Sequence, residues 1–77
     1  MIYELWDIQS KNLVGDYRTR DEALRIVRSA FETHGRDAVR RLALSVEDRS
    51  GNTSPIADGD ALIDLALEGK SIARPAN

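Results

Sequence analysis

The segment 19–35, TRDEALRIVRSAFETHG, contains its own start, apolar stripe and stop, so it constrains the fold more than any other stretch. Thr19 followed by Glu22 is a capping box, in which the threonine hydroxyl accepts from the Glu22 N–H and the carboxylate reaches back to the Thr19 N–H. Gly35 is the residue type that commonly ends a helix. The apolar positions follow the helical repeat: Ala23, Leu24, Val27, Ala30 and Phe31. The sequence therefore predicts a helix that ends near His34 and packs along one side.

Strand patterns lie on both sides of this helix. Before it, residues 2–8 are rich in β-branched and aromatic residues, and a polar QSKN turn leads to a second strand at 13–17. After it, residues 41–48 alternate apolar and polar side chains, and a turn at 49–52 precedes a short strand at 53–57. We therefore predict two hairpins separated by the helix.

A second helix is expected at 61–69, ALIDLALEG, with Asp58 or Asp60 as its cap. It is apolar on almost every side, so we expect it to be covered on more than one side. The element order is then ββαββα in a single α+β domain of residues 1–69. Residues 70–77 offer little to bury and are expected to form a flexible tail.

The order of the strands in the sheet follows from connection rules. A right-handed crossover through the first helix brings the third strand beside the first, giving a four-stranded antiparallel sheet of order 2-1-3-4. Pro55 cannot donate to a sheet ladder, so the fourth strand belongs at an edge, and Gly15 indicates a bulge or a close backbone approach. Helix 1 covers one face. Either the C-terminal helix 2 or a second subunit covers the other, because the internal first strand is apolar on both faces.

The composition argues against several classes of function. The 77 residues include no cysteine, which rules out disulfides and thiolate metal sites and fits a reducing cytoplasm. Eleven basic and thirteen acidic residues give a net charge of -2, unlike the basic excess of most nucleic-acid-binding domains. No apolar run approaches the roughly 20 residues that span a membrane, and the first residues lack a secretory signal pattern. We expect a cytoplasmic protein with no membrane partner.

The chain offers few groups for catalysis. His34 is the one histidine, and its expected role is a favourable interaction with the carboxyl end of its helix. The DRSGN stretch at 48–52 is typical of a hairpin turn, because a calcium-binding loop would need a glutamate where residue 59 is glycine. Neither a phosphate-binding loop nor a nucleophile elbow is present. We therefore expect no enzyme activity, no metal and no cofactor.

Aromatic residues of the first hairpin form one candidate partner-binding surface. Tyr3, Trp6 and Tyr17 could lie together as a platform on the sheet. Such a platform can anchor a protein interface or stack bases. Packing into the core is the alternative for these residues.

An arginine corner after the first helix forms the other candidate surface. Arg36, Arg40 and Arg41 have only Asp37 as a nearby acid in the sequence. The arginines within 19–35 differ, because two of them have an acidic residue one helical turn away. We therefore predict that any surface for phosphate or an acidic partner lies at this corner.

Several motifs between Tyr3 and Leu44 resemble a group of small uncharacterised bacterial proteins: YELWD, NLVGDY, T..EAL..VR.A...HG and LAL. That group has no established activity. A looser resemblance is to HicB-type antitoxins, which place a T.EEAL helix after a hairpin, matched here by Thr19, Glu22, Ala23 and Leu24. The chain has no counterpart of their P.LPGC-like segment, extra strand or DNA-binding tail. The resemblance implies a shared hairpin and helix arrangement, with an antitoxin-like role as one form of partner binding.

Together these observations predict a non-enzymatic protein-interaction module that forms a homodimer or binds a larger protein partner. The alternative is a small nucleic-acid-binding regulator that uses the arginine corner, which the net acidity does not favour. The residues expected to contact a partner are Tyr3, Trp6, Tyr17, Arg36, Arg40 and Arg41.

Overall fold

The computed structural model describes residues 1–73 of the chain, with side chains as far as Glu68. The described elements are β1 (Ile2–Asp7), β2 (Asn12–Tyr17), α1 (Arg20–His34), α2 (Arg36–Val39), β3 (Leu42–Glu47), β4 (Thr53–Asp58) and α3 (Gly59–Ala73). The α+β class and the antiparallel sheet order β2-β1-β3-β4 are confirmed. The sequence did not predict the one-turn helix α2, and α3 continues past Gly69, where the second helix was expected to end. Of the expected flexible tail at 70–77, residues 74–77 lie outside the described residues.

The ends of α1 are fixed by the predicted cap and stop. The Thr19 Oγ1 accepts from the Glu22 N–H at 3.1 Å. The Glu22 carboxylate accepts from the backbone N–H of Arg18 at 3.2 Å, one residue earlier than the capping box predicts. Gly35 has φ 88°, a left-handed conformation that suits glycine, and its N–H donates to the Phe31 carbonyl at 2.9 Å. The helix therefore begins and ends where the sequence indicates.

The first hairpin contains the irregularity expected at Gly15. Trp6 faces Leu13 across the ladder, whereas Leu5 faces Gly15, so Val14 is an extra residue in β2. The turn of this hairpin contains one left-handed residue, Lys11, with φ 62°. The bulge changes which residues of β2 point to each face of the sheet.

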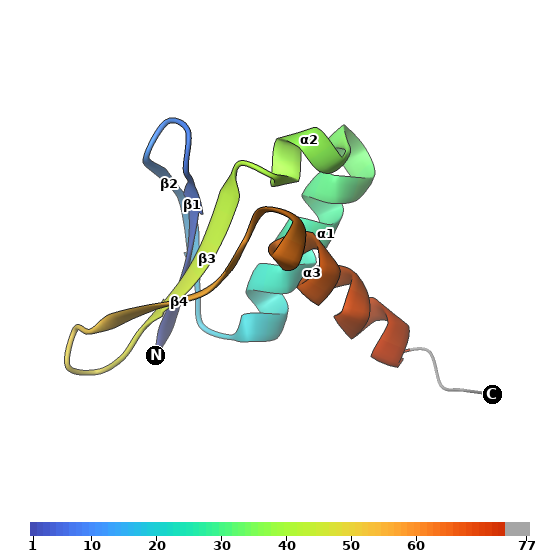
Figure 1. The fold of residues 1–77 in the computed structure, drawn as a ribbon. Coiled ribbons are helices and arrows are strands. Elements are labelled where there is room, and N and C mark those ends of the chain that lie inside the picture. The colour runs from blue at the N-terminus through green and yellow to red at the C-terminus, as the bar shows by residue number, and fades with distance from the viewer. Residues whose placement is uncertain (74–77) are drawn as a thin grey trace.

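All three described helices lie on one side of the sheet (Figure 1). The core between the two layers is built from Leu5 and Leu44 of the sheet, Val27 of α1, and Leu62 and Ile63 of α3, each at most 1% exposed. Helix α3 packs beside α1 and against β3 and β4. The alternative in which the C-terminal helix covers the second face of the sheet is therefore wrong. No helix in the described part of the chain is long and apolar enough to cross a bilayer.

Candidate functional site

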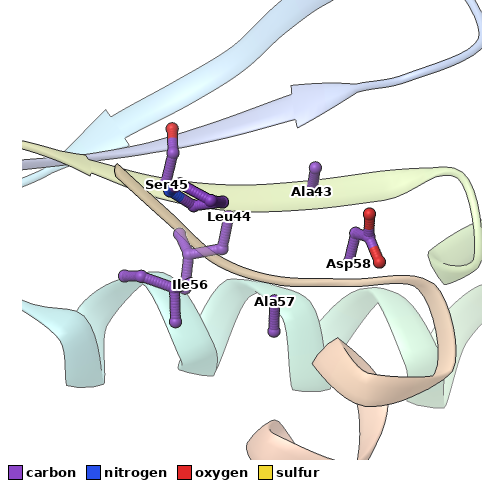
Figure 2. Close-up of a pocket in the computed structure, with 7 residues that line it drawn as sticks. Ala43, Leu44, Ser45, Ile56, Ala57 and Asp58 are labelled. Atoms are coloured by element: carbon purple, nitrogen blue, oxygen red, sulfur yellow. The ribbon is translucent and has the colours of Figure 1, made fainter. Parts of the chain in front are cut away.

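The second face of the sheet carries no described helix. Residues opposite one another in an antiparallel sheet point to the same side, so the strand register assigns every position to a face. We call the uncovered side the open face. Its residues are Ile2, Glu4 and Trp6 of β1, Leu13 and Asp16 of β2, Ala43, Ser45 and Glu47 of β3, and Thr53, Pro55 and Asp58 of β4. Figure 2 shows the two sides at β3 and β4: Ala43 and Ser45 point away from the helices, and Leu44 and Ala57 point toward them.

An apolar band crosses the open face. Trp6 lies on an internal strand and is flanked by Leu13 of β2 and Ala43 of β3. Ile2, on the same strand and face, is 39% exposed, and Leu13 is 44% exposed. Trp6 itself is half-buried, although no described helix covers it. Aromatic side chains of this kind contribute disproportionately to protein interfaces.

The charged residues of the open face are all acidic. They are Glu4, Asp16, Glu47 and Asp58, and the face has no lysine, arginine or histidine. None of the four carboxylates belongs to an ion pair among the described side chains. Glu4 and Asp16 stand directly opposite each other on β1 and β2. Like charges in this arrangement repel and destabilise a sheet.

A second bulge shapes the part of the sheet that is formed by β3 and β4. Leu44 faces Ala57, whereas Ser45 faces Pro55, so Ile56 is an extra residue in the edge strand. A shallow depression of about 250 Å³ lies at this bulge (Figure 2). The Ser45 hydroxyl is buried there and has no hydrogen-bond partner among the described residues. An unsatisfied buried hydroxyl costs about 1–3 kcal/mol of stability.

The three predicted aromatic residues do not form one platform. Tyr3 and Tyr17 stand opposite each other on the helix-covered side of the sheet, and both pack against the core. Burial raises the pKa of the Tyr17 phenol above its usual range, with smaller effects from Asp16 and Glu22. Trp6 alone lies on the open face. Core packing, the alternative considered from the sequence, thus describes both tyrosines.

The predicted arginine corner is engaged with acidic side chains. Arg36 Nη1 and Arg40 Nε each lie 3.1 Å from Asp60 Oδ1, and Arg40 Nη1 lies 3.4 Å from Asp37 Oδ1. The hydrogen bonds from Arg40, and then Arg36, lower the pKa of Asp60. The Arg36 guanidinium also lies 5.7 Å from the centre of the Phe31 ring. These contacts tie α2 to the first turn of α3.

Arg41 makes a separate contact. Its Nε lies 3.0 Å from Asp7 Oδ2 at the end of β1. The other oxygen of Asp7 accepts from the backbone N–H groups of Gln9 at 2.9 Å and Ser10 at 3.1 Å. The Ser10 N–H foremost, and also Arg41, lower the pKa of Asp7. All three arginines of the predicted corner therefore have a carboxylate partner within the fold.

Groups suited to catalysis are sparse in the described part of the chain. His34 is exposed at the last residue of α1. Among the described residues, no three or more histidine, aspartate or glutamate side chains are placed to hold a metal ion. The arrangement of the open face suits binding, because it combines an apolar band with four carboxylates that have no ion-pair partner among the described side chains.

The acidic character of the open face was not recognised from the sequence. The signal was present as alternation, since Glu4 shares a parity with Trp6, and Glu47 shares one with Ala43. Placing Asp16 and Asp58 on the same face also requires the strand register and both bulges. No protein-family model, no curated protein and no solved structure matches the chain.

Proposed function

We propose that this protein is a non-enzymatic protein-interaction module that docks a partner on the open face of its sheet. The observation that carries the proposal is the position of Trp6, which lies between Leu13 and Ala43 on a face of the sheet that carries no described helix. A sheet in a layered domain usually buries both apolar faces, so a second layer is expected from another chain.

Two kinds of chain could form the second layer on the open face. It is either a second copy, giving a homodimer, or a larger protein partner, of which an antitoxin-like complex is one example. A cytoplasmic partner is expected because the cysteine-free composition fits a reducing compartment.

The test compares two isoleucines with equal exposure. Ile2 on the open face and Ile26 on α1 are both 39% exposed, so Ile2→Ser and Ile26→Ser remove similar apolar area at different places. Proteins captured by the wild type are purified, and their binding to each variant is measured by titration. Ile2→Ser should weaken binding, and Ile26→Ser should leave it unchanged.

Trp6 provides an independent readout because it is the one tryptophan of the chain. Burial by a docked partner without tryptophan should shift its emission to shorter wavelength. Sedimentation over a concentration series detects self-association of the purified protein. Three results together would contradict the proposal. The protein stays monomeric, Ile2→Ser does not change the affinity for captured proteins, and their binding leaves Trp6 emission unchanged.

The alternative function, nucleic-acid binding, would require the arginine corner to rearrange. Arg36, Arg40 and Arg41 would have to exchange carboxylate partners for phosphates. Binding of labelled duplex DNA or RNA, titrated at several salt concentrations, tests this alternative. Phosphate-driven binding weakens steeply as salt rises, and the absence of binding at low salt would remove the alternative.

A further inference from the structure

We propose that the occupant of the open face is a basic amphipathic helix of a different protein, rather than a second copy of this chain. This inference rests on the proposed function and specifies the partner's chemistry. It follows from the charge, the strand register and the dimensions of the open face.

The charge pattern selects a cationic partner. Glu4, Asp16, Glu47 and Asp58 lie on the same face as the apolar band and have no ion-pair partner among the described side chains. The net charge of the whole chain is only -2, so four unpaired carboxylates on one face represent a local concentration of acid. Complementary charge steers association and suppresses wrong partners.

The pairing of Glu4 with Asp16 strengthens the inference. Two carboxylates directly opposite in a ladder repel in the free protein. A lysine or arginine docked between them would turn this repulsion into attraction. The arrangement costs stability in the free protein, and a basic partner recovers that stability on binding.

A second copy does not supply this chemistry. Two open faces stacked about a two-fold axis would bring four carboxylates against four carboxylates. The basic residues in the described segments next to these strands lie outside the strands themselves: Lys11, Arg18, Arg40, Arg41 and Arg49. Two of them, Arg40 and Arg41, already pair with carboxylates of their own chain. A heterologous contact through α1 is also poorly matched, because its apolar stripe is buried in its own core.

The open face is large enough for a docked helix. Four strands about 4.8 Å apart give a width of about 14 Å, and strands of six residues give a length of about 20 Å. A helix with its side chains is about 10–12 Å across, and about 14 residues cover 20 Å. Helices α1 and α3 already pack on the other face of the same sheet.

The experiment uses two synthetic helical peptides of about 14 residues. They share one leucine stripe and carry either lysine or glutamate at every polar position. Each is titrated into the full-length protein while Trp6 emission and the dissociation constant are measured. We expect the leucine/lysine peptide to bind with a blue shift of Trp6 emission, and the leucine/glutamate peptide not to bind.

Two pairs of substitutions locate the charge effect. The double substitution Glu4→Gln with Asp16→Asn should raise the dissociation constant of the lysine peptide about five-fold, because two exposed ion pairs with the peptide are lost. The same pair should raise the stability of the free protein, since it removes the repulsion. The control pair, Asp64→Asn with Glu68→Gln on the exposed side of α3, should leave peptide affinity unchanged. If Glu4 and Asp16 only stabilised the fold, their substitution would not weaken peptide binding while raising the stability of the free protein.

The outcomes separate this inference from the proposed function. The inference of a basic partner is overturned if both peptides bind equally well, or if the Glu4 and Asp16 substitutions leave the affinity for the lysine peptide unchanged. If Ile2→Ser still weakens binding in that case, the docking function stands. A dimer that is lost in Ile2→Ser and that excludes the lysine peptide also overturns the inference while supporting docking by a second copy. Absence of both self-association and Ile2-dependent binding overturns both proposals.

Discussion

The phenol ring of Tyr17 lies over the backbone of Gly15, two residues earlier on the same face of β2. A Cβ added at Gly15 would lie 2.6 Å from Tyr17 Oη and 3.0 Å from Cζ. Gly15 therefore provides the space in which the tyrosine reaches the core beside Tyr3. The residue that weakens strand propensity at this position also permits aromatic packing at an edge strand.

Gly15→Ala should lower the free energy of unfolding by about 1–3 kcal/mol, the usual range for overpacking. The cost should decrease in a Tyr17→Phe background, because the nearest atom is then absent. Denaturant unfolding of the four proteins in this double-mutant cycle measures the coupling. Equal costs of Gly15→Ala in the two backgrounds would contradict the steric explanation.

Thr19 provides a second test of a local contact. Thr19→Ala should destabilise the protein by about 1 kcal/mol, because the Glu22 N–H loses its acceptor at the start of α1. Thr19→Ser keeps the hydroxyl and should retain most of the stability. Thermal unfolding monitored by circular dichroism compares the two variants, and equal losses would indicate that the cap contributes little.

Acid should destabilise the protein through Asp60 and Asp7. The pKa of each carboxyl is lowered in the folded state from 3.8, so each stabilises the fold when ionised. That contribution is present above the unfolded pKa and is lost as the pH falls through the lower folded pKa. Urea unfolding should therefore show stability decreasing as the pH drops below about 4.

Substitutions can show how much of the loss of stability at low pH comes from the ion pairs of Asp60 with Arg36 and Arg40. Asp60→Asn should be less stable than the wild type at neutral pH and should lose less stability on acidification. Arg40→Gln removes the first cause of the lowered pKa of Asp60, so it should reduce the acid response in the same direction. An acid response that is identical in all three proteins would place its origin elsewhere.

Ser45→Ala should stabilise the free protein by up to about 1 kcal/mol, because it deletes a buried hydroxyl without a partner. Most substitutions destabilise, so a gain is a distinctive outcome. Ser50→Ala in the exposed β3–β4 turn serves as a control of the same chemistry, since its backbone N–H, rather than its hydroxyl, donates to Asp48. A clear loss of stability in Ser45→Ala would show that the hydroxyl has a partner.

Local signals in the sequence accounted for most of the fold. The Thr19 cap, the stop at Gly35, the alternation in the strands and the edge position of Pro55 each depend on residues close in sequence. The side of the sheet that α3 occupies was not predictable in this way. Its apolar residues fit either face, and only packing against α1 decides between them.

The candidate site was less predictable because it depends on register. The bulges at Val14 and Ile56 each shift the alternation by one residue, which changes the face to which neighbouring side chains belong. The pairing of Arg40 with Asp60 joins positions 20 residues apart, so no sequence window contains both. Trp6 was predicted from the sequence to contact a partner, but the acidic residues beside it on the open face were not part of that prediction.

The same two bulges restrict how this protein can assemble. Each lies in an edge strand, and β4 also contains Pro55, so neither edge presents a regular row of hydrogen-bonding groups to another strand. A partner can therefore pack against the face of the sheet, whereas pairing of a further strand along either edge is disfavoured. If the proposed docking on the open face occurs, it is expected to end after one partner has bound, which would give a complex of fixed stoichiometry instead of a growing fibre.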